Sequence, residues 1–76
     1  MATQNDRFDA LDEDSLYRYL TDTAAKRCEY LEIEERTDGW VAEIWREGGK
    51  VTIVAFGARG PDRRTAMLRL ARKYRS

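Results

Sequence analysis

Arginine is the residue type that best suits this chain to ligand binding, and it is concentrated near the carboxyl terminus. Residues 59–76 contain seven basic residues and one acidic residue, whereas residues 1–58 contain seven basic and thirteen acidic residues. Guanidinium groups bind phosphate through paired hydrogen bonds, so the cluster predicts contact with an anionic ligand. The residues predicted to bind nucleic acid are Arg59, Arg63, Arg64, Arg69, Arg72 and Arg75. The alternative is a solvated helix face that balances the acidic remainder of the chain.

A second predicted surface is apolar and aromatic. Tyr30, Val41 and Trp45 are expected on one side of a sheet, pointing away from its helices among several glutamates. An aromatic centre with a charged rim is typical of a protein interface, so we expect a protein partner or a second copy of the chain here. Two other interpretations stay open: burial of these side chains by the amino-terminal residues, and simple exposure to solvent.

Catalytic and metal chemistry is not expected. The chain has no histidine, one cysteine and two serines, so neither a Ser-His-Asp triad nor a Cys/His zinc site can be assembled within it. The cluster Asp12-Glu13-Asp14 lacks the glycine and the bidentate glutamate of a calcium loop. Paired acids such as Glu32 and Glu34 leave an enzyme as a distant third interpretation. We therefore predict a non-catalytic protein without metal or cofactor, with Cys28 as a small buried residue.

Length and composition bound the kind of protein. At 76 residues, 42% apolar and 37% charged, the chain suffices for one compact domain and is too short for two. No apolar run approaches the ~20 residues that cross a bilayer, so we expect no membrane partner. The first residues lack the basic and apolar regions of a secretory signal, and one cysteine cannot form an intrachain disulfide. A cytoplasmic location is the expectation.

The amino-terminal half is expected to contain one helix. Residues 1–10 are polar without periodicity and are predicted to be a flexible arm, which leaves residues 11–76 as the single domain. A helix is predicted from Glu13 to Arg27, because Asp12 can cap it and apolar residues recur every four positions.

From Cys28 the pattern changes to alternation with a period of two, which is typical of strands. Strands are predicted over Glu29–Glu35, Trp40–Arg46 and Val51–Phe56, with Trp40 facing the helices and Trp45 facing away. Gly57–Gly60 are expected to break the third strand, and a basic helix is predicted to begin at Pro61. The predicted fold class is α+β, in the order α-β-β-β-α: a three-stranded antiparallel meander with two helices on one face.

This order, from Asp12 to Tyr74, resembles a double-stranded RNA-binding domain. That family closes its sheet with a glycine-containing turn and opens its last helix with two basic residues, one further residue and alanine, which Arg63, Arg64 and Ala66 match. The resemblance implies that cations at this helix amino terminus hold phosphates across an RNA major groove. The leading predicted function is weak duplex RNA-like binding through the basic carboxy-terminal helix. The alternative is a small protein-interaction or regulatory module that uses the outer sheet face around Trp45.

Overall fold

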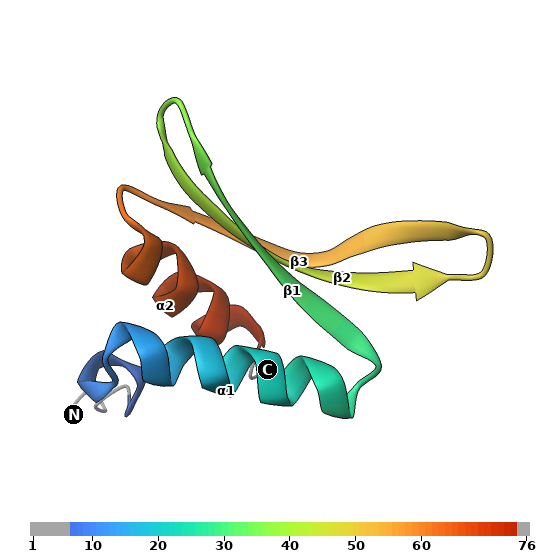
Figure 1. Cartoon of the computed structure of the whole chain (residues 1–76), viewed down its shortest axis with the longest axis horizontal. Helices are drawn as coiled ribbons and strands as arrows, with labels where there is room; N and C mark the ends of the chain where they lie inside the picture. The colour runs from blue at the N-terminus through green and yellow to red at the C-terminus, as the bar shows by residue number, and fades with distance from the viewer. Residues whose placement is uncertain (1–6, 75–76) are drawn as a thin grey trace.

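The computed structural model of the chain describes residues 7–74, and its elements follow the predicted order. They are the short 3-10 helix η1 (Arg7–Ala10), helix α1 (Glu13–Lys26), strands β1 (Glu29–Arg36), β2 (Gly39–Gly48) and β3 (Val51–Gly60), and helix α2 (Arg63–Tyr74). The three strands are antiparallel in the order β1-β2-β3, and both helices lie against the same face of the sheet (Figure 1). The α-β-β-β-α fold is confirmed. No helix in the described part of the chain is long and apolar enough to cross a membrane.

Both helices begin at an aspartate that caps them. The Asp12 carboxylate accepts a hydrogen bond from the backbone N–H of Ser15 at 2.8 Å, and Asp62 accepts one from Thr65 at 2.7 Å. These bonds satisfy free donors of each first turn and hold the pKa of both aspartates below the usual value. Helix α1 ends at Lys26, one residue before the predicted end.

The core fills the space between the helices and the inner face of the sheet. The helices contribute most of the large apolar side chains because their apolar stripes face one another and the strands. The fully buried large side chains are Phe8, Leu16, Leu20, Ile44, Met67, Leu70 and Tyr74. Trp40 packs against this cluster as predicted, on the opposite side of β2 from Trp45.

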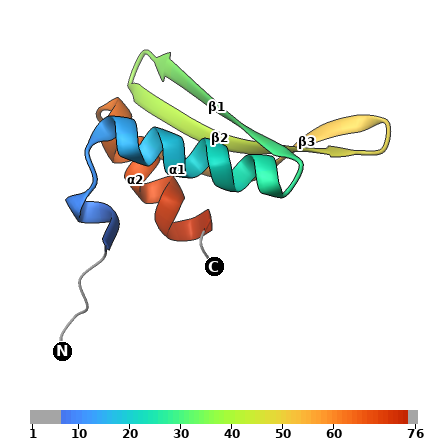
Figure 2. The same ribbon diagram turned by 60° about the horizontal axis from the view of Figure 1, so that its bottom comes forward.

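Strands β2 and β3 are longer than predicted. Gly57–Gly60 continue β3 instead of breaking it, because residues 40–43 of β2 provide pairing partners for all four. A bulge between Ile44 and Trp45 leaves Ala55 as the extra residue of β3. A Cβ on Gly60 would lie 2.7 Å from the backbone N of Ala66, so glycine is required for β3 to lead directly into α2. The paired ends of β2 and β3 extend past the helices (Figure 2).

The flexible arm predicted over residues 1–10 is corrected where the structure describes it. Residues 7–10 form η1, and the Phe8 side chain is fully buried against Tyr19, with ring centroids 5.0 Å apart. An aromatic side chain can be buried by one short turn without any periodic pattern, which explains the difference. Residues 1–6 lie outside the described residues.

The prediction of a buried Cys28 is wrong. Its φ is 60°, in the left-handed region that residues other than glycine rarely adopt, and its side chain is exposed. Cys28 lies where the chain reverses from α1 into β1, outside the packed layer.

Candidate functional site

Three of the predicted phosphate-binding arginines hold α2 to the amino-terminal elements. Arg63 forms an ion pair with Glu13 of α1, and its guanidinium lies 5.3 Å from the Tyr17 ring centroid. Arg64 donates from Nη2 to the backbone oxygens of Asp9 and Leu11, at 3.0 and 2.7 Å. Arg72 pairs with the Asp9 carboxylate at 2.7 Å. These partners give the three arginines a role in the fold itself.

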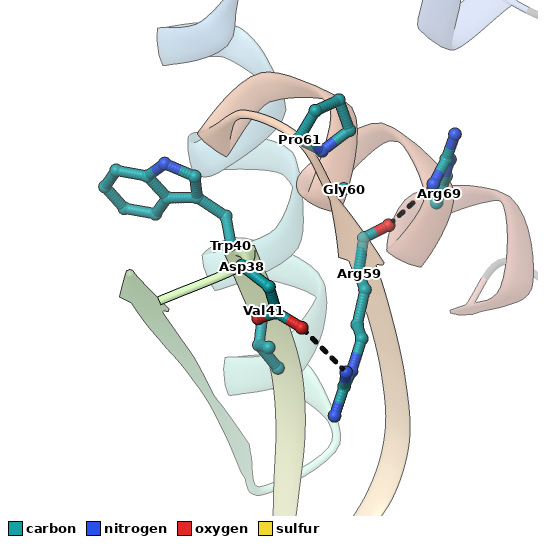
Figure 3. Close-up of a pocket in the computed structure, with 7 residues that line it drawn as sticks. All are labelled: Asp38, Trp40, Val41, Arg59, Gly60, Pro61 and Arg69. Atoms are coloured by element: carbon teal, nitrogen blue, oxygen red, sulfur yellow. Dashed lines mark hydrogen bonds and ion pairs between the residues drawn. The ribbon is translucent and has the colours of Figure 1, made fainter. Parts of the chain in front are cut away.

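Three other basic residues lie along the β3 edge of the sheet. Arg69 donates from Nη1 to the backbone oxygen of Arg59 at 3.0 Å, and Lys73 donates from Nζ to the backbone oxygen of Gly57 at 2.7 Å. Among residues 7–74, neither Arg69 nor Lys73 has a carboxylate within ion-pair distance. Figure 3 shows Arg69 directed at the Arg59 carbonyl while the Arg59 side chain runs away along the strand. We call Arg59, Arg69 and Lys73 the basic strip.

Arg59 lies between two shallow hollows. Its side chain is 71% exposed, and the nearest carboxylate oxygen is Oδ2 of Asp38 at 3.8 Å (Figure 3). One hollow is also lined by Trp40, Pro61 and Arg69, and the other by residues that include Arg36 and Lys73. Exposed cations beside shallow hollows can reach an extended anionic ligand, whereas neither hollow encloses a small substrate.

Lys73 was not predicted as a binding residue, because all the predicted cations were arginines. The signal was available, since Lys73 follows Arg69 by four residues and therefore lies on the same side of α2. Of the other predicted cations, Arg75 lies outside the described residues.

The predicted protein-contact residues do not form one patch. Tyr30 and Trp45 are directly opposite each other on the outer face, and the Trp45 indole N–H donates to Oε1 of Glu43 at 3.2 Å. Val41 is on the same face but is buried, because it lies between Glu34 and Arg59 on the adjacent strands, whose long side chains flank it. Val54, opposite Trp45 on β3, completes the exposed apolar row instead.

A buried carboxylate lies on the inner face, where no functional residue was predicted. Glu29 accepts hydrogen bonds from the Tyr74 hydroxyl and, at 2.7 Å, from Nε of Arg46. The Tyr74 bond is the main cause that lowers the pKa of Glu29, with Arg46 adding to it. The signal was the alternation of β1, which places Glu29 on the same side as Leu31 and Ile33. A carboxylate with both oxygens engaged and a lowered pKa suits structure better than acid-base catalysis.

Searches of protein-family models, curated proteins and solved structures found no match to the chain. Within residues 7–74, no three Cys, Asp or Glu side chains are grouped so that they could hold a metal ion.

Proposed function

We propose that the chain is a non-catalytic module that binds the phosphate backbone of duplex nucleic acid, of the RNA type, through the basic strip. One observation carries the proposal: Arg59, Arg69 and Lys73 are cations on one edge of the sheet whose charge is left largely uncompensated by neighbouring carboxylates. The resemblance to double-stranded RNA-binding domains favours RNA as the duplex. The proposal places the phosphate contacts at the basic strip and not at Arg63 and Arg64, because these two arginines are bound to Glu13, Asp9 and Leu11 within the fold.

Two of the three cations are already ordered. A guanidinium or ammonium group that donates to a neutral carbonyl keeps its full charge and its remaining N–H donors. Arg69 and Lys73 are one turn apart on α2, so their Cβ atoms are separated by about 5–6 Å. Because both side chains are held against β3, less conformational entropy is lost when phosphates bind.

The test is the salt dependence of binding to a fluorescent duplex RNA and to a duplex DNA, measured by anisotropy. Three neutralised phosphates give a slope of log affinity against log salt of roughly −2.7 on B-DNA. The double variant Arg69→Gln with Lys73→Gln keeps a donor at each carbonyl but removes both charges. We expect it to weaken binding at least tenfold at low salt and to reduce the slope by about two.

The matched control is Arg18→Gln with Lys26→Gln on α1. Both side chains are exposed, and the variant changes the net charge by the same amount away from the basic strip. We expect the control to retain most of the affinity. Absence of duplex binding at low salt, or equal losses in the two variants, would contradict the proposal.

A protein ligand at the outer sheet face is the second candidate. Tyr30 is 48% exposed directly opposite the half-buried Trp45, an aromatic pair suited to a partner with an apolar surface. In that case the duplexes do not bind and Tyr30→Ser weakens association with the partner, while Arg69→Gln with Lys73→Gln has no effect on it.

A further inference from the structure

The outer end of the β2–β3 hairpin carries three of the five exposed large apolar side chains among the described residues. We call residues 46–54 the hairpin arm. Val51 is 60% exposed, Ile53 46% and Val54 42%, all three on β3. The arm extends beyond both helices, and β1 begins opposite Arg46, so neither the helices nor β1 cover the rest of the arm (Figures 1 and 2). An exposed apolar edge strand is a site where a further strand can pair.

The free edge of β3 is divided into two parts. At Gly57 and Arg59 the backbone oxygens accept hydrogen bonds from Lys73 and Arg69, which close this part of the edge to another strand. No side chain among residues 7–74 donates to the backbone of Val51–Phe56. An unprotected edge strand offers its free N–H and C=O groups to a further strand.

Charge distinguishes this edge from the other one. The opposite edge, β1, carries Glu32, Glu34 and Glu35, so two copies would repel each other there. Residues 51–58 contain no charged side chain. A second copy of the chain therefore meets no like charge within this segment of β3.

We propose that two copies of the chain associate by antiparallel pairing of β3 with β3 along the hairpin arm. A two-fold axis makes the contact isologous, so each copy covers the apolar side chains of the other. The tight turn at Gly49 and Lys50 limits the pairing at one end, and the closed carbonyl of Gly57 limits it at the other. The midpoint of the open segment Val51–Phe56 lies between Ile53 and Val54, and we centre the pairing on Ile53, which then faces Ile53 of the second copy. This inference does not depend on nucleic-acid binding.

The size of the contact sets its strength. A stable interface buries about 800 Å² on each partner, and a short strand edge with three exposed apolar side chains falls below that. We therefore expect a monomer–dimer equilibrium that depends on protein concentration, in the micromolar range or weaker. The axis is perpendicular to the sheet, so the joined six-stranded sheet has all four helices on one face.

Sedimentation velocity over a wide concentration range tests the association. Ile53→Lys places a charge on the edge, a device that natural edge strands use against pairing, and should lower the association constant at least tenfold. The matched control is Tyr17→Lys on α1, where the exposed side chain is 44% accessible and distant from the arm. We expect the control to associate like the unmodified chain, with circular dichroism confirming that both variants are folded.

Disulfide trapping tests the register. In a Cys28→Ser background, Ile53→Cys should form a disulfide-linked dimer on mild oxidation, because directly opposite residues in an antiparallel pair have Cα atoms about 4.5–5.5 Å apart. Val51→Cys is the control, since its copies would be separated by about 14 Å along the strands. A chain that stays monomeric, association unaffected by Ile53→Lys, or species larger than a dimer from open-ended pairing would each overturn the proposal. Trapping at residue 51 in preference to residue 53 would also overturn it.

Discussion

At the level of single residues, the contact between Glu29 and Tyr74 ties the first strand to the last helix. The Tyr74 hydroxyl donates to a buried carboxylate whose other oxygen is bound by Arg46. Burial is the main cause that raises the pKa of Tyr74 to about 12, and the Glu29 carboxylate adds to it. The two side chains are 45 positions apart in the sequence, so the contact forms only when the whole domain is folded.

The stability of the domain should therefore fall at alkaline pH. Tyr74 has a higher pKa in the folded state than the ordinary value of 10.0, so its contribution is full below about pH 10 and is lost between about pH 10 and 12. Glu29 acts at the other end: its lowered pKa stabilises the fold above its ordinary value of 4.5, and this contribution is lost as the pH falls below it. Urea denaturation across the pH range measures both effects.

The variant Tyr74→Phe isolates this contact. At neutral pH it should cost about 1–3 kcal/mol, because it leaves a buried carboxylate oxygen without its donor. It should also flatten the dependence between pH 10 and 12. Tyr30→Phe on the exposed outer face serves as the control and should change neither property. If both variants lose stability at alkaline pH as the unmodified chain does, Tyr74 is not the group responsible.

At the level of elements, η1 is joined to α2 by the contacts of Arg64 and Arg72 and to α1 by an aromatic contact. Phe8 is fully buried beside Tyr19, and Arg64 and Arg72 hold the backbone and carboxylate of residues next to it. Helix η1 is thus part of the domain and completes its core.

Phe8→Ala should lower the free energy of unfolding by about 3 kcal/mol, the usual cost of removing a buried aromatic side chain. Tyr17→Ala, at an exposed aromatic of α1, is the control and should cost well under half as much. Urea denaturation compares the two, and limited trypsin digestion should cut after Arg7 sooner in Phe8→Ala. Equal stabilities would mean that η1 contributes little to the core.

Elements in which apolar residues recur at a regular spacing were predictable from the sequence. Elements without such a spacing were not. Alternation along β2 predicted that Trp40 faces the core and Trp45 faces away from it. The structure places both side chains in this way. Phe8 stands alone in a polar segment, where no period indicates burial. Strand β3 was predicted too short because glycines were treated as breaks, although Gly57 and Gly60 have partners on β2.

The candidate site was predictable only in part, for a related reason. The spacing of arginines on α2 identified a basic element, and Arg59 and Arg69 belong to the basic strip. The spacing of the arginines could not reveal that Arg63 pairs with Glu13, which is 50 positions away in the sequence. Long-range partners decide which cations remain available to a ligand, and local patterns carry no information about them.

At the level of the whole molecule, a net charge of zero conceals an internal division. Residues 59–76 have a balance of +6 and residues 1–58 a balance of −6. The fold places basic α2 against the acidic amino-terminal elements, through Arg63 with Glu13 and Arg72 with Asp9. Part of the positive charge is neutralised in this way, whereas the basic strip on the β3 edge keeps its charge for a phosphate ligand.

This arrangement predicts that salt weakens the fold. Raising the salt concentration from about 0.01 M to about 1 M shortens the Debye length from about 30 Å to about 3 Å, which screens exposed pairs. The two pairs are partly exposed and together contribute roughly 1 kcal/mol, so their loss should lower the melting temperature by about 4–8 °C. Differential scanning calorimetry at both salt concentrations measures the shift.

The double variant Asp9→Asn with Glu13→Gln separates these two pairs from general effects of salt on apolar burial. Because this variant lacks both carboxylates, its melting temperature at low salt should be lower than that of the unmodified chain. Added salt should then lower its melting temperature by a smaller amount. Asp14→Asn with Asp22→Asn is the matched control: it removes the same charge from exposed residues of α1 that have no ion pair among residues 7–74. We expect the control to keep the full salt response, because its contacts with α2 are intact. A response that is the same in both variants would show that the attraction between the two halves is diffuse and does not reside in these contacts.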